Sequence, residues 1–177
     1  TLFRSTKYRK AGNMMLLALY TGMRRGEMFN LKWEHIDWAR NFINLVGKDD
    51  GLGAKSGQSE RIPLNEMARE VLTSISRGAS EYVFPGKGGG KLVDIRKQAD
   101  ALKKEAGLPA DFRPFHGLRH VYASMLASSG KVSMYELQKL MTHKSPAMTQ
   151  RYAHLRDDAL IKASEVTKDV IYKIMNS

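Results

Sequence analysis

Two pairs of charged or titratable side chains stand at helical spacing in this sequence. Arg24 and Glu27 are three residues apart, as are His116 and Arg119. Residues three or four positions apart share one face of a helix, so the members of each pair can act together. A guanidinium can donate two hydrogen bonds to a phosphate, and an imidazole can exchange a proton near neutral pH. Taken singly, such pairs also occur on ordinary surface helices, where an exposed ion pair contributes little.

A metal site is the first alternative for the histidines. His116 and His120 are four residues apart, a spacing at which a helix can present two zinc ligands. The segment HGLRH nevertheless has no glutamate after its first histidine and no clear third ligand, and the chain has no cysteine. We therefore expect no metal ion and no other cofactor in the site.

Three further candidates lie in or beside predicted loops. Lys55 stands in a polar, glycine-rich stretch before a short strand-like run, so we expect it at the tip or edge of a hairpin. His143 precedes the pair Ser145-Pro146, which predicts the start of a helix, and could equally be an ordinary loop histidine. Tyr152 is one of seven tyrosines, so its residue type alone does not single it out.

The elements that must position these residues follow from the hydrophobic pattern. An unbroken apolar run over residues 13–20 predicts a buried helix ending near Gly22, and residues 24–33 predict a second helix. Alternation over residues 36–46, around a turn near Arg40 and Asn41, predicts a β-hairpin, and residues 61–64 read as a further strand.

The rest of the chain has helical periodicity. Helices are predicted over residues 65–77, 94–107, 116–130, 133–143 and 145–155, with caps at Asn65, Ser133 and Ser145. A glycine-rich loop over residues 86–90 lacks the spacing of a nucleotide phosphate loop, and an amphipathic tail runs from Asp157 to Met175. We predict one domain over residues 1–177, mainly α with a small antiparallel β-sheet (α+β).

The charge balance favours a polyanionic partner. There are 29 Lys and Arg against 18 Asp and Glu, a net charge of +11 with a pI near 9.9. Nucleic acid is the commonest partner of such a chain, although charge alone leaves RNA and an anionic membrane surface open. No stretch is long and apolar enough to span a membrane, and the first residues lack the apolar core of a signal peptide. We therefore expect a soluble, intracellular protein.

Four ordered blocks give the sequence a family resemblance. The segments TGMRRGE, AKSGQSERIPL, HGLRH and MTHKSPAMTQRYAHL follow one another as the signature blocks of tyrosine recombinases, or phage integrases, do, from about Asn13 to Leu155. The resemblance implies the catalytic-domain fold of that family. It also implies a set of catalytic residues: Arg24, Lys55, His116, Arg119, His143 and the nucleophile Tyr152. Two positions depart from the usual pattern: Thr142 stands where many members have glycine, and Val121, which we attribute to packing, replaces a common threonine.

The roles implied by the resemblance form a consistent chemistry. Tyr152 attacks the scissile phosphate and forms a covalent phosphotyrosyl bond, which conserves the ester energy for rejoining without ATP. Arg24 and Arg119 bind the phosphate oxygens where negative charge grows. His116 is the candidate base, and His143 adds a donor to the same oxygens.

Two side chains complete this predicted site. Lys55 would protonate the leaving 5′-oxygen, and a simple phosphate contact is its alternative role. Glu27 would orient the Arg24 guanidinium without touching the phosphate itself, and an ordinary surface ion pair is the alternative.

The expected function is site-specific recombination of double-stranded DNA, most simply integration and excision of a phage or other mobile element. Within the same chemistry the alternatives are a chromosome-resolution recombinase and a tyrosine-type topoisomerase. A non-catalytic DNA-binding module is the alternative from a different class. The resemblance also implies a DNA-binding domain before residue 1, a tetramer on DNA formed from free monomers, and a tail over residues 157–177 that docks on a neighbouring protomer.

Overall fold

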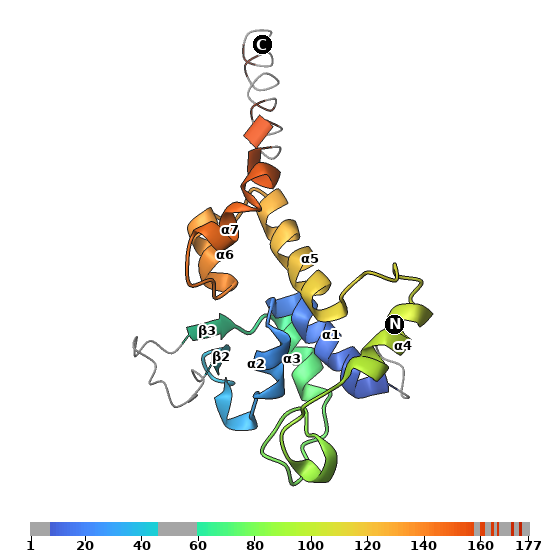
Figure 1. Ribbon diagram of the computed structural model, residues 1–177. Coiled ribbons are helices and arrows are strands. Elements are labelled where there is room, and N and C mark those ends of the chain that lie inside the picture. Colours follow the sequence, from blue (N-terminus) through green and yellow to red (C-terminus); the bar gives the residue numbers. More distant parts are fainter. Residues whose placement is uncertain are drawn as a thin grey trace. The chain divides into compact units, whose positions relative to one another are not determined.

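The computed structural model describes residues 8–45 and 60–157, together with residues 160, 161, 164, 166, 171 and 174. The chain divides into two compact units, Thr1–Tyr122 and Ala123–Ser177, and each is described by itself. Most described residues are helical, and one small antiparallel sheet is present (Figure 1). The predicted fold class is therefore confirmed.

The first unit is organised around helix α1 (Arg9–Thr21). Most of its residues are buried, as the apolar run predicts, and it packs against both α3 (Glu66–Thr73) and α4 (Arg96–Glu105) (Figure 1). The helix ends where predicted, because Gly22 takes the left-handed conformation with φ 68° and donates its N–H to the carbonyl of Ala18.

The second predicted helix is shorter than expected. Helix α2 covers only Arg25–Phe29, and a separate 3-10 turn, η3, covers Trp33–His35. Leu31 lies between them, and its carbonyl accepts a hydrogen bond from the N–H of Val83. This long-range bond gives the backbone a partner outside the helix, a constraint that local periodicity cannot reveal.

The sheet consists of β1 (Ile36–Asp37), β2 (Phe42–Leu45) and β3 (Glu60–Pro63), in the order β1-β2-β3. Both pairings are antiparallel, so the predicted hairpin and following strand are confirmed. Asn41, at the predicted turn, has φ 56°, a conformation that asparagine tolerates better than most residues. Ile43 faces Ile62 across the sheet and both are buried, which fixes which face of the sheet meets the core.

Capping ties the helices of the first unit together. The Asn65 side chain accepts the N–H of Ala68 at 2.9 Å, which caps α3 as predicted, and its Nδ2 donates to the carbonyl of Tyr20 at 2.7 Å. One side chain thus satisfies the start of α3 and the end of α1. Helix α3 ends at Thr73, earlier than predicted, and the glycine-rich loop contains a short 3-10 turn, η4 (Lys87–Gly89).

Helix α5 (Pro114–Ser128) begins in the first unit, where Phe115 and Leu118 join the hydrophobic core, and continues into the second. The second unit also holds α6 (Met134–Leu140) and α7 (Ala147–Gln150), which pack together. Ser133 caps α6 as predicted. The predicted cap at Ser145 is wrong, because α7 begins one residue later with Pro146 at its N-cap and no side-chain capping bond.

Candidate active site

Arg24 lies in the turn between α1 and α2 and donates two hydrogen bonds to its neighbour Glu27. The Glu27 carboxylate accepts the Arg24 guanidinium at 2.7 Å and the Arg24 backbone N–H at 2.6 Å. The two side chains keep 36% and 17% of their surface exposed. The carboxylate is therefore an N-terminal partner for α2 and also an orienting contact for the guanidinium.

Arg119, from α5, reaches the same turn. Its side chain is buried, and Nη1 donates a hydrogen bond to the carbonyl of Gly22, two residues before Arg24. The bond joins residues 97 positions apart in the chain. The fold thus brings one predicted arginine to the turn that carries the other.

His116 lies one helical turn before His120 on α5. Their Nε2 atoms are 2.8 Å apart, and the rings meet edge to face with centroids 4.3 Å apart. Between His116 and Arg119, Gly117 lies close under the ring of Phe112, where a Cβ atom would overlap it. The glycine of HGLRH therefore has a packing role that sequence reasoning did not identify.

In the second unit, Thr149 connects the two remaining described candidates. Its hydroxyl lies 2.8 Å from Nδ1 of His143, and its carbonyl accepts the backbone N–H of Tyr152 at 3.0 Å. Thr149 and Tyr152 are 1% and 5% exposed. No sequence pattern pointed to Thr149, because its role depends on how the loop after α6 meets α7.

The turn that presents His143 has a strained residue at its centre. The N–H of Thr142 binds the carbonyl of Lys139 and that of His143 binds the carbonyl of Gln138, a Schellman arrangement at the end of α6. Thr142 occupies the left-handed position of this motif with φ 47°. The position where this chain departs from the family pattern is thus one whose conformation favours glycine.

The second departure has a different setting. Val121 keeps 40% of its surface exposed, so our attribution of this substitution to packing is wrong. Its neighbour Tyr122 is partly buried, and burial raises the pKa of its phenol while the nearby Arg119 guanidinium opposes that rise. Tyr122 is therefore a poor source of phenolate near neutral pH.

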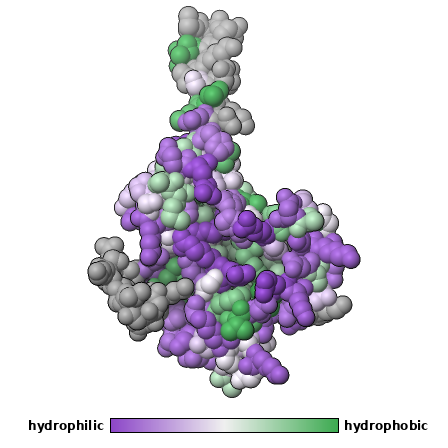
Figure 2. Space-filling view, in the orientation of Figure 1, coloured by the Kyte–Doolittle hydropathy of each residue, from purple (hydrophilic) through white to green (hydrophobic). Residues whose placement is uncertain are grey.

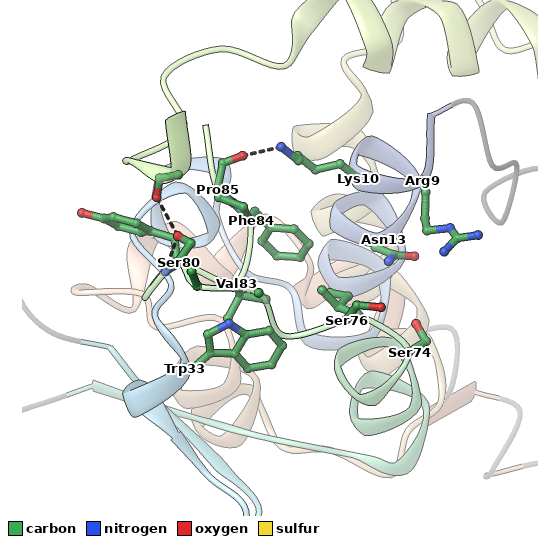
Figure 3. Close-up of a pocket in the computed structure, with 15 residues that line it drawn as sticks. Arg9, Lys10, Asn13, Trp33, Ser74, Ser76, Ser80, Val83, Phe84 and Pro85 are labelled. Carbon is green, nitrogen blue, oxygen red and sulfur yellow. Dashed lines mark hydrogen bonds between the residues drawn. The ribbon is translucent and has the colours of Figure 1, made fainter. Parts of the chain in front are cut away.

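A pocket of about 460 Å³ lies elsewhere in the first unit (Figure 3). It is bounded by the start of α1, by Trp33 and by residues between Ser74 and Gly89, and its walls include Asn13, Val83 and Phe84. None of the described candidate residues lines it. The candidate catalytic residues therefore do not form this pocket.

The candidates fall into two groups. Arg24, Glu27, His116 and Arg119 belong to the first unit, and His143 and Tyr152 belong to the second. Lys55 lies outside the described residues.

Mostly hydrophilic side chains cover the face of the molecule shown in Figure 2.

Among the described residues, no group of three or more His, Cys, Asp or Glu side chains is placed to hold a metal ion. None of the helices within the described ranges has the length and apolar character needed to cross a membrane.

Comparison with known proteins gives consistent matches. The chain matches the phage integrase family over residues 3–159. It is 30% identical over 176 residues to a shufflon-specific DNA recombinase of Escherichia coli, covering 97% of this chain and 43% of that protein. It is 34% identical over 156 residues to the integrase of Salmonella phage P22, covering 81% and 38%. The chain thus spans less than half the length of these two relatives.

A solved structure has the same fold. The Tn1549 transposon integrase, in complex with circular intermediate DNA, superimposes with a TM-score of 0.69 at 22% sequence identity. The match covers 84% of this chain and 54% of that one. The fold expected from the four sequence blocks is confirmed.

Proposed function

Because the chain belongs to the phage integrase family, we propose that it is the catalytic part of a site-specific recombinase acting on double-stranded DNA. The observation that carries this proposal is the hydrogen bond from Arg119 to the carbonyl of Gly22, beside Arg24. It supports two guanidinium groups acting on one phosphodiester. Two fixed cations supply the positive charge that a phosphoryl-transfer transition state requires.

In the proposed reaction, the Tyr152 hydroxyl oxygen attacks the scissile phosphorus and the bond from phosphorus to the 5′-oxygen breaks. Unperturbed phenols have a pKa of about 10, so the attacking hydroxyl must pass its proton to a base, and we assign His116 to that role. The product is a 3′-phosphotyrosyl bond and a free 5′-hydroxyl. A different 5′-hydroxyl then reverses the step, which rejoins the strand without ATP.

The remaining candidates complete the proposed site. Lys55 gives a proton to the departing 5′-oxygen, and His143 donates a hydrogen bond to the phosphate from the ring nitrogen opposite Thr149. Glu27 orients Arg24 and does not touch DNA. Tyr152 is only 5% exposed, so its hydroxyl has to become accessible when DNA binds.

The whole protein has further parts in this proposal. The relatives are more than twice as long as the matched region, which supports an additional DNA-binding domain in the whole protein. We assign the protein to recombination of phage or other mobile DNA in a bacterial cell, at the nucleoid. It would be a monomer when free and a tetramer on DNA.

The C-terminal tail supports such an assembly. Five apolar side chains of the tail are at least half exposed: Leu160, Ile161, Val166, Ile171 and Ile174. A helix with an uncovered apolar face gains free energy by burying it against another surface. We propose that the tail docks on a neighbouring protomer, and gel filtration with DNA, with and without residues 157–177, tests this. An unchanged assembly size after truncation contradicts it.

A covalent adduct tests the chemistry directly. The chain is incubated with nicked duplexes of randomised core sequence, from which the short 5′-hydroxyl fragment is lost after cleavage, and the products are separated on a denaturing gel. Wild type should form a protein–DNA adduct in the presence of EDTA, and Tyr152→Phe should form none. Tyr135→Phe is the matched control, because Tyr135 is 66% exposed on α6, and it should react as wild type does.

Two results would contradict the proposal. An adduct with Tyr152→Phe would assign the nucleophile to another residue. Loss of the wild-type adduct in EDTA would show that the phosphate charge is neutralised by a metal and not by the two arginines alone.

A further inference from the structure

The histidine pair on α5 has a geometry that the recombination chemistry does not require. The Nε2 atoms of His116 and His120 approach to 2.8 Å, and the pair lies at the protein surface. A neutral imidazole carries one hydrogen on its two nitrogens, so at this distance one Nε2–H donates to the lone pair of the other Nε2. The two rings therefore direct the same nitrogen toward a common point.

Convergent imidazole nitrogens are a ligand pair for a transition-metal ion. Neutral imidazole suits Zn²⁺, Cu²⁺ and Ni²⁺, and helical zinc sites take two of their ligands from histidines four residues apart. Zinc–nitrogen bonds of about 2.0–2.1 Å at tetrahedral angles require the two nitrogens to be about 3.3 Å apart. The two nitrogens, 2.8 Å apart, therefore have to separate by about 0.5 Å when the metal binds.

We propose that His116 and His120 form a reversible two-ligand site for a divalent transition-metal ion, represented by Zn²⁺. On binding, each Nε2 gives its lone pair to the metal, and the hydrogen held between the rings moves to an Nδ1 nitrogen. Water fills the remaining positions, because no group of three metal-ligating side chains exists among the described residues. The ion is a dissociable ligand and not a structural component.

Bound zinc inhibits the enzyme. This consequence rests on the proposed function, in which His116 accepts the proton of Tyr152 through a ring nitrogen. A metal on Nε2 removes the lone pair needed for that transfer and places a hydrated cation beside it. Zinc at this site therefore slows strand cleavage, in contrast to a catalytic metal, whose removal would do so.

Isothermal titration calorimetry of the whole chain with ZnCl₂ at pH 7.5 tests the site without reference to cleavage. Wild type should bind one Zn²⁺, and His120→Gln and His116→Gln should each weaken binding about tenfold or more, since either leaves a single imidazole. His154→Gln is the matched control, because His154 is also exposed but stands outside the pair. It should bind as wild type does.

Lowering the pH gives an independent measurement. Protonated imidazole cannot bind metal, so wild-type affinity should fall more than tenfold between pH 7.5 and pH 5.5. Undiminished binding by His120→Gln, or equal loss in His154→Gln, would overturn the assignment. Circular dichroism of each variant shows whether its helices are intact.

The adduct assay separates failure of the site from failure of the proposed function. In this assay run without EDTA, zinc should reduce the rate of adduct formation by wild type, and the fractional inhibition should be at least tenfold smaller at the same zinc concentration in His120→Gln. If wild type forms no adduct at all, the proposed function fails while calorimetry still decides the metal site. If calorimetry shows the site but zinc leaves wild-type cleavage unchanged, the inhibitory role is wrong.

Discussion

Replacing Glu27 tests how far Arg24 depends on its neighbour. The Glu27 carboxylate accepts two hydrogen bonds from Arg24, one from the backbone and one from the guanidinium. Losing such an N-terminal contact costs about 1 kcal/mol, and a partly exposed ion pair adds up to about 0.5 kcal/mol. Glu27→Ala should therefore lower the free energy of unfolding by about 1.5 kcal/mol. Glu27→Gln, which keeps an acceptor but loses the charge, should cost about half as much.

The effect on the reaction should have a distinct signature. Without the carboxylate, the Arg24 guanidinium samples orientations that do not face the phosphate. The single-turnover rate of adduct formation should fall on the order of tenfold, the low end of what loss of an orienting partner costs. DNA affinity should change little, because phosphate binding is distributed over many of the basic side chains.

Urea unfolding and single-turnover kinetics at saturating DNA measure the two effects separately. Glu34→Gln is the matched control, because its side chain is 70% exposed and lies 3.8 Å from Lys32. It should change stability by less than about 0.5 kcal/mol and leave the rate unchanged. A Glu27→Ala variant that loses stability but cleaves at the wild-type rate would refute the orienting role and leave only a helix cap.

Three further changes have clear expected outcomes. Thr142→Gly should raise the free energy of unfolding by about 0.5–1 kcal/mol in thermal unfolding, because φ is 47° there, and a lower melting temperature would contradict this. Gly117→Ala should lower stability by about 1–2 kcal/mol through overlap with Phe112, whereas Gly26→Ala, with open space around it, should not. Burial lowers the pKa of His35, and its Nδ1 accepts a backbone N–H. His35 therefore binds a proton more readily in the unfolded chain than in the folded one. The stability that His35 contributes should be fully present above about pH 6.5 and should fall as the pH drops below it. Urea unfolding at pH 7.5 and pH 5.5 measures this, and the free energy of unfolding should fall less between the two pH values in His35→Gln than in wild type.

Local signals predicted most elements of the fold. The apolar run before Gly22, the alternation around Asn41 and the caps at Asn65 and Ser133 each involve residues only a few positions apart. The structure confirms them because the physics is local: a cap needs one side chain, and a hairpin needs one turn.

Two predictions about helices were wrong, and one of them failed because of a contact between distant segments. The helix predicted over residues 24–33 breaks where the Leu31 carbonyl takes a partner from Val83. Ser145 is not the cap of α7, since Pro146 begins that helix without a side-chain capping bond. Neither outcome is encoded in hydrophobic periodicity.

For the candidate site, too, the sequence determined some features and the tertiary structure determined others. By itself the sequence determined which residue types are available: two arginines, a histidine beside one of them, a second histidine before a helix and a tyrosine after it. It also determined the excess of positive charge, which depends on composition, and the left-handed residue Gly22 at the end of α1, which depends on local sequence. The tertiary structure decided that Arg119 reaches the carbonyl beside Arg24 and that Thr149 joins His143 to the segment of Tyr152. The first of these contacts joins residues 97 positions apart and exists only after packing brings remote segments together, whereas the second depends on how the loop after α6 meets α7.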